Sequence, residues 1–129
     1  MIKPFSKMDI GAYGEKIACR YLKRKGYKIV AKNRRESHKE IDVIVTNREY
    51  IAFVEVKTRS VDTDLYNVYG TPASAVTSAK QANLIAGARA YLRVNPSSKQ
   101  PRMDVVEIYL QKGTKKVLNI NHFEGAYHA

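Results

Sequence analysis

The sequence predicts a single α/β domain in which a mixed central sheet is flanked by helices. Two stretches repeat apolar residues at helical spacing, and five shorter stretches are rich in β-formers, which gives the element order α-β-β-β-α-β-β. The length of 129 residues suits one hydrophobic core, and the sequence contains neither an internal repeat nor an interdomain linker. Because a helix separates the third strand from the fourth, a crossover connection is expected between them.

The first predicted helix covers residues 9–25. Its apolar side chains recur three or four positions apart and form one apolar face. Gly26 follows at the position where a glycine can close a helix. Cys19, the one cysteine, lies on this helix among apolar residues, so we expect it to pack in the core rather than to act as a nucleophile.

Three strands are predicted next, over residues 27–34, 39–46 and 50–59. Ser37 and His38 form the first turn, and residues 46–49 read as a hairpin connection that places the second and third strands side by side. The third strand is apolar on both faces, which is typical of a central strand covered on both sides.

The rest of the chain completes the sheet. Residues 60–70 lack apolar periodicity and predict a flexible binding loop or lid, after which Thr71 and Pro72 supply the N-cap and first-turn proline of a helix over 73–93. A fourth strand over 102–111 and a short fifth strand over 115–121 follow. We expect loosely held ends at about 1–8 and 122–129.

The charge of the chain predicts its partner. Lys and Arg number 23 against 12 Asp and Glu, so the formal net charge is +11. A field of this sign attracts polyanions, which favours nucleic acid over the alternative of an anionic membrane surface. No apolar run approaches the roughly 18 residues of a spanning helix, and the N-terminus lacks a signal-peptide core. We therefore expect a cytoplasmic protein that binds DNA and no membrane.

Asp42, Glu55 and Lys57 are the strongest candidates for a functional site. Glu55 and Lys57 stand two apart on a predicted strand, so their side chains leave the same face, and the hairpin brings Asp42 beside them. Two carboxylates and an ammonium suit metal-assisted phosphodiester hydrolysis. The alternative is a solvated face or a cross-strand ion pair. Because the strand is apolar on both sides, unpaired charges there are costly, and a site is favoured.

An ordered set of motifs runs from Gly14 to Val106. The motifs are Gly14-Glu15 with Ala18 and Tyr21-Leu22, Gly26-Tyr27, Glu40-Ile41-Asp42-Val43-Ile44, Phe53-Val54-Glu55-Val56-Lys57-Thr58-Arg59, Gly70-Thr71-Pro72 with Ala75-Val76-Thr77 and Lys80-Gln81, and Arg102-Met103-Asp104-Val105-Val106. Together they resemble the bacterial YraN-like family of predicted endonucleases, which is similar to archaeal Holliday-junction resolvases. The resemblance implies a restriction-endonuclease-like core, a DNA endonuclease acting on branched or structured DNA, and a homodimer.

Carried to this sequence, the resemblance implies that Asp42 and Glu55 bind Mg²⁺ or Mn²⁺ and that Lys57 positions or activates the attacking water. It adds Glu15 as a further acidic ligand, whose alternative is a solvated helix glutamate, and Gln81 as a residue that orients a water or phosphate. We favour Lys57 as a positioner over Lys57 as a base, because two nearby carboxylates oppose a lowering of its pKa.

Further candidates surround these residues. We expect Arg34, Arg35, Arg59 and Lys80 to contact phosphates, and Tyr66 and Tyr69 to stack on unpaired bases. The alternative for each cation is simple solvation. Glu40 is either a further ligand or exposed, and Arg102 with Asp104 forms a structural pair or a rim contact.

Two functions therefore remain open. The first is a metal-dependent endonuclease, and the second is a non-catalytic nucleic-acid-binding module in DNA repair or RNA metabolism. A buried, metal-competent site at Asp42, Glu55 and Lys57 favours the first, and an ion pair closed to solvent favours the second. Other chemistries lack their motifs, because the sequence has no phosphate loop, no Gly-x-Ser-x-Gly elbow and no zinc-ligand spacing.

Overall fold

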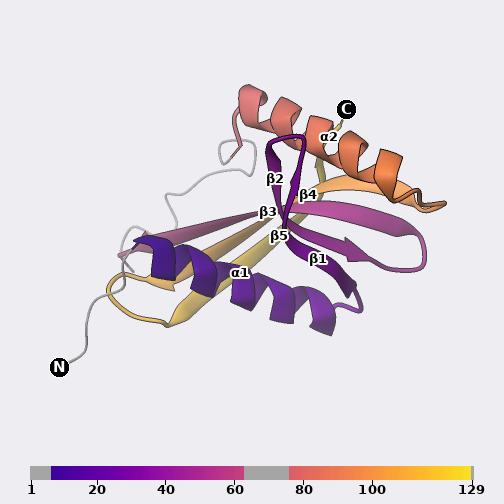
Figure 1. Cartoon of the computed structure of the whole chain (residues 1–129). Coiled ribbons are helices and arrows are strands. Elements are labelled where there is room, and N and C mark those ends of the chain that lie inside the picture. The colour runs from indigo at the N-terminus through magenta and orange to yellow at the C-terminus, as the bar shows by residue number, and fades with distance from the viewer. Residues whose placement is uncertain (1–6, 63–75, 129) are drawn as a thin grey trace.

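A computed structural model describes residues 7–62 and 76–128 of the chain (Figure 1). Within these ranges the elements are α1 (Lys7–Arg24), β1 (Lys28–Glu36), β2 (Lys39–Thr46), β3 (Tyr50–Val61), α2 (Ser78–Val94), β4 (Gln100–Gln111) and β5 (Val117–Tyr127). The predicted order of helices and strands is confirmed. Neither helix in the described part of the chain has the length and apolar character needed to cross a membrane.

The strands form one mixed sheet in the order β1-β2-β3-β4-β5. The connection through α2 makes β3 and β4 parallel, whereas every other neighbouring pair is antiparallel. Strand β3 lies in the middle, and its pairing with β4 runs over its whole length, from Tyr50 opposite Gln100 to Val61 opposite Gln111. The mixed sheet and the central position of β3 agree with the prediction.

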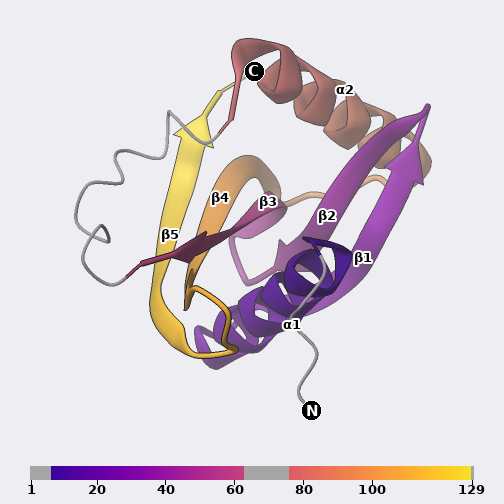
Figure 2. The same cartoon turned by 90° about the vertical axis from the view of Figure 1, so that its left-hand side faces the viewer.

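The two helices cover opposite faces of the sheet (Figures 1 and 2). One core cluster joins α1 to the sheet and contains Ala18, Leu22, Val43, Val54, Val106 and Ile108. The other joins α2 to the sheet and contains Ile44, Phe53, Leu84, Tyr91 and Val105. Because neighbouring side chains on β3 point to alternate faces, Val54 and Phe53 belong to different clusters. The sheet is therefore buried on both sides.

Local residues set the ends of the elements. Gly26 closes α1 with φ +98°, while the N–H of Tyr27 bonds the carbonyl of Leu22 and the N–H of Gly26 bonds that of Lys23. Ser37 and His38 both have positive φ, as a two-residue hairpin turn requires. These caps and turns lie where the sequence predicts them.

A close approach fixes α1 on the sheet. A Cβ atom added at Gly14 would lie 1.7 Å from Oγ1 of Thr58 on β3. Only glycine therefore allows the helix backbone to pack so near the strand. The contact places the following residue, Glu15, beside the part of β3 that carries Glu55 and Lys57.

Most predicted boundaries lie within about two residues of the observed ones, but two are wrong by more than that. Helix α2 begins at Ser78 rather than at 73, because Thr77 has an extended backbone and its side chain accepts the N–H of Lys80 as the N-cap. Thr71 and Pro72 lie outside the described residues. Strand β5 extends to Tyr127 rather than ending near 121, so residues 122–127 belong to the sheet rather than to a loosely held end. An irregularity in its pairing with β4, between Met103 and Val105, breaks the alternation of side chains in this part of the strand.

Candidate metal-dependent nuclease site

A cavity of about 560 Å³ opens where β2 separates from β3. The last paired residues of the two strands are Val43 and Val54, although β2 continues its pairing with β1 beyond that point. The cavity is lined by Ile10, Gly11 and Glu15 from α1, Asp42 from β2, Glu55, Val56, Lys57, Thr58 and Ser60 from β3, and Lys80 from α2. The separation of the strands thus brings the predicted acidic residues and Lys57 into one cavity.

Asp42 lies at the point of separation. The backbone N–H of Val56 donates to Oδ2 of Asp42 at 2.9 Å, so the carboxyl group replaces the strand partner that this N–H lacks. Burial and the adjacent charge of Glu55 raise the pKa of Asp42 to about 7, against the lowering effect of the Val56 hydrogen bond. A side-chain hydrogen bond also joins the two carboxyl groups. The two carboxyl groups therefore lie close enough to interact directly.

Glu55 is the most enclosed member of the site. Its side chain is 5% exposed, and Oε1 lies 2.5 Å from Nζ of Lys80 and 3.8 Å from Nζ of Lys57. A buried carboxylate is costly unless it is paired, and here the two ammonium groups supply that pairing. The Lys57 and Lys80 side chains are 29% and 44% exposed, so the ion pairs are open to solvent through the cavity.

The pKa of Lys57 shifts in the direction opposite to the one expected from its two carboxylate neighbours. Burial lowers its pKa, and so do the hydrogen bond and the positive charge of Lys80, whereas the attractions of Glu55 and Asp42 raise it. The net direction is downward. The sequence argument did not include the second lysine, which lies on a helix distant in the chain.

The sequence did not predict that Lys80 lies against Glu55. Lys80 was predicted to contact phosphates, but the structure places it against Glu55 in the first turn of α2. Burial by itself lowers its pKa, but hydrogen bonds to Glu55 and Lys57 outweigh burial and raise it. Its position next to Gln81 in the ordered motifs was the available signal, although the packing of α2 beside β3 was needed to interpret it.

Glu15 lines the cavity from α1, as predicted. Burial raises its pKa, a hydrogen bond from the Asn33 side chain lowers it, and the charges of Glu40 and Glu55 raise it further. Glu40 itself is exposed and is not among the described residues that line the cavity. Glu15 thus lies within electrostatic range of the carboxyl pair, and Glu40 fits its solvated alternative.

The other predicted residues have different surroundings. The Gln81 side chain donates to the carbonyl of Val76 at 3.1 Å and is not among the described residues that line the cavity, so its role at this site stays a prediction. Arg34 pairs with Glu36 at 2.6 Å, and Arg59 lies 3.6 Å from the buried Glu107. Arg35 is exposed on the same strand as Arg34. Tyr66 and Tyr69 lie outside the described residues.

The carboxylates of the cavity offer two ligands to a cation such as Mg²⁺, but not three. No group of three or more His, Cys, Asp or Glu side chains within residues 7–62 and 76–128 is arranged to hold a metal ion. Glu15 therefore does not complete a three-carboxylate site in this conformation. Mg²⁺, however, is commonly bound by one or two carboxylates while it keeps several waters. Asp42 and Glu55 meet that requirement, because two adjoining carboxyl groups that repel one another are stabilised by a cation between them.

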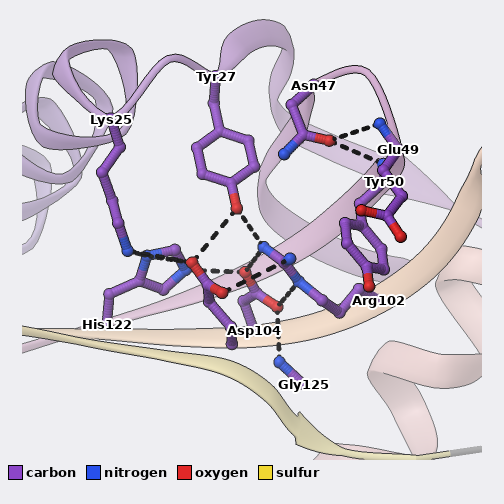
Figure 3. A network of polar contacts seen from close by, with 10 residues as sticks. Lys25, Tyr27, Asn47, Glu49, Tyr50, Arg102, Asp104, His122 and Gly125 are labelled. Carbon is purple, nitrogen blue, oxygen red and sulfur yellow. Dashed lines mark hydrogen bonds and ion pairs between the residues drawn. The ribbon is translucent and has the colours of Figure 1, made fainter.

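A second polar network lies around Asp104 (Figure 3). Arg102 donates to both oxygens of Asp104 at 2.8 Å, and Nε2 of His122 and the N–H of Gly125 bond the same carboxylate at 2.8 and 3.0 Å. Burial raises the pKa of Asp104, but these hydrogen bonds lower it overall. Asp104 is fully buried, so the structural-pair alternative for Arg102 and Asp104 is the correct one.

Comparison with known proteins supports one family. The model of the uncharacterised protein family UPF0102 matches residues 14–108. A UPF0102 protein of Caldanaerobacter subterraneus subsp. tengcongensis is 39% identical over 98% of this chain and 100% of its own length. UPF0102 proteins of Alkaliphilus oremlandii and Chloroherpeton thalassium are 40% and 41% identical over 92% and 88% of this chain and 97% and 85% of their own lengths. The YraN-like resemblance is thereby confirmed at the level of the family, and this chain belongs to UPF0102.

Proposed function

We propose that this chain is a metal-dependent endonuclease that hydrolyses phosphodiester bonds in DNA, built on a restriction-endonuclease-like core. The observation that carries the proposal is the convergence of Asp42, Glu55 and Lys57 in one solvent-accessible cavity where β2 leaves β3. Such a constellation offers carboxylate ligands and a cation beside one reacting phosphate. The net charge of +11 favours a polyanionic substrate.

The surroundings of each residue indicate its role in the proposed reaction. Asp42 and Glu55 would hold a Mg²⁺ or Mn²⁺ ion through their carboxylate oxygens. The backbone carbonyl of Val56 would offer a further oxygen ligand. In a strand, this carbonyl lies along the same edge as the N–H of Val56, which bonds Asp42. When bound, the metal polarises the scissile phosphate and lowers the pKa of its water. Lys57 would position that water and, as an ammonium, balance the developing negative charge.

The alternative is a nucleic-acid-binding module that cleaves nothing. An ion pair closed to solvent would favour it. The observed ion pairs involve lysine side chains that are 29% and 44% exposed, and they line a cavity rather than a sealed core. This observation supports the nuclease over the binding module.

The test uses a panel of labelled DNA: linear duplex, flap, four-way junction and single strand, each with Mg²⁺ or Mn²⁺. The parent protein is compared with Glu55→Ala, Lys57→Ala and the control Lys112→Ala, which removes an exposed lysine in the turn between β4 and β5. We expect cleavage by the parent and the control, none by the two site variants, and retained binding by all four. Binding without cleavage on every substrate would instead support the non-catalytic module.

We also propose that the active form is a homodimer, by analogy with resolvases. Two symmetric nicks in a branched DNA require two sites related by a two-fold axis. Sedimentation of the protein with and without a four-way junction tests this, and a strictly monomeric protein on the junction would contradict it.

A further inference from the structure

The two lysines of the cavity approach the same oxygen of Glu55. Nζ of Lys80 lies 2.5 Å from Oε1, and Nζ of Lys57 lies 3.8 Å from it. The shorter contact belongs to the lysine that comes from α2, on an element separate from the strand that carries Glu55. An ammonium at that distance covers one of the oxygens with which the proposed site would hold a metal.

The position of Lys80 on its helix indicates that Glu55 holds it there. Thr77 is the N-cap, so Lys80 lies in the first turn, where the helix dipole is positive and a cation is disfavoured. The first turn of α2 contains no acidic residue that could compensate. The ammonium group of Lys80 is therefore held by the Glu55 carboxylate across the cavity, and it does not stabilise the helix.

We propose that Lys80 is a built-in counter-ion that competes with the divalent cation for Glu55 and thereby sets the metal affinity of the site. The inference rests on the proposed metal site and adds to it the residue that controls how tightly the site is filled. A divalent cation bound at Oε1 and an ammonium 2.5 Å from the same atom repel one another strongly, so the two exclude each other.

The Lys80 side chain is exposed enough to move away from Glu55. Lys80 is 44% exposed, whereas Glu55 is 5% exposed and Lys57 is 29% exposed. Displacement of Lys80 by a metal ion moves a long flexible side chain toward solvent and leaves the buried carboxylate paired. The released ammonium then lies at the rim of the cavity, where a phosphate of the substrate can bind it.

Mn²⁺ binding to the protein without DNA tests this, measured by the electron paramagnetic resonance signal of free Mn²⁺. We expect Lys80→Gln to bind Mn²⁺ about tenfold more tightly than the parent, a coupling typical of two competing ligands. Lys80→Arg, which keeps the charge, should retain the weak binding. Arg89→Gln removes one positive charge from an exposed position on the same helix and should equal the parent.

The outcomes separate this inference from the proposed function. Mn²⁺ binding that is lost in Glu55→Gln but equal in Lys80→Gln and Arg89→Gln would leave the metal site in place and overturn the role of Lys80. Failure of every variant to bind Mn²⁺ would overturn both proposals. Circular dichroism establishes that each variant is folded.

A measurement on the parent protein avoids substitutions altogether. If Mn²⁺ displaces Lys80, its amine should be acetylated several-fold faster by acetic anhydride with Mn²⁺ than without it, as read by mass spectrometry of the modified peptides. Lys112, in the exposed turn, supplies the internal reference and should not change. An unchanged rate at Lys80 under conditions where Mn²⁺ binds would contradict the inference.

Discussion

The side chain of Asp42 accepts the backbone N–H of Val56 at 2.9 Å, at the place where β2 separates from β3. A side chain thus completes the backbone hydrogen bonding of the central strand and at the same time lines the cavity. Because the two roles belong to one carboxyl group, a change at Asp42 affects both the strand edge and the proposed chemistry.

The stability of the protein should depend on pH through Asp42. The folded-state pKa of about 7 is above the ordinary aspartate value of 3.8, so the folded protein binds this proton more tightly than the unfolded chain. The stabilisation from Asp42 is complete below about pH 4 and is lost as the pH rises to 7. Relative to Asp42→Asn, the parent should lose on the order of 4 kcal/mol over that window in urea unfolding, since each pKa unit corresponds to about 1.4 kcal/mol. A constant difference between the two proteins would contradict this assignment.

Lys57→Met should separate chemistry from metal binding. The substitution keeps the length of the side chain and removes the ammonium, so a cleavage rate that depends on Lys57 should fall by about 100-fold or more. Mn²⁺ binding should remain, because the carboxylates are unchanged. Lys112→Met is the matched control and should cleave at the parent rate. A cleavage rate for Lys57→Met close to that of the control would exclude the assigned role.

Gly14→Ala should destabilise the fold. Its new Cβ would lie 1.7 Å from Oγ1 and 2.8 Å from Cβ of Thr58, so α1 must move away from β3. We expect a loss of about 2–3 kcal/mol in the free energy of unfolding. The control is Gly11→Ala on the same helix, where the added Cβ meets no atom within 4 Å and should leave stability equal or slightly higher. Equal stabilities of the two variants would show that the close approach is not a constraint.

Asp104→Ala should be more disruptive than a surface substitution. It removes the acceptor of Arg102, His122 and the Gly125 N–H, and leaves an arginine side chain that is 11% exposed without its main partner. A loss of about 3–5 kcal/mol in the free energy of unfolding is expected. Glu124→Ala, whose side chain is 44% exposed, should cost less than about 1 kcal/mol. Similar losses in the two variants would refute the structural role of the Asp104 network.

Local signals predicted most of the fold. The φ of Gly26 and the two-residue turn at Ser37 and His38 follow from short-range chemistry, and the apolar faces of β3 identified it as the central strand. The start of α2 and the end of β5 were misplaced, because a competing proline signal lay upstream of Thr77 and the second half of β5 contains His122, Glu124 and Gly125. Those three residues are kept in the sheet by contacts with Asp104 and Lys25, which no local pattern encodes.

The sequence brought the strand residues of the candidate site together, but it did not predict the contact of Lys80 with Glu55. Glu55 and Lys57 share a strand, and a hairpin connects them to Asp42, so sequence spacing was sufficient to bring them together. Lys80 and Gln81 are adjacent in the chain, but Lys80 contacts Glu55 whereas Gln81 bonds the carbonyl of Val76. The rotation of α2 about its axis decides which of them faces Glu55. That rotation depends on the packing of Leu84, Ala88 and Tyr91 against the sheet.

The measurement that tests the central claim most directly is the initial rate of DNA cleavage by the parent and by Glu55→Gln across the same four substrates, with Mn²⁺ and with the metal removed by EDTA. The account predicts that the parent cleaves at least one substrate only when the metal is present, and that Glu55→Gln, which keeps the shape of the side chain, cleaves none while still binding DNA. Cleavage that persists in Glu55→Gln or in EDTA, or no cleavage by the parent on any substrate, would contradict it.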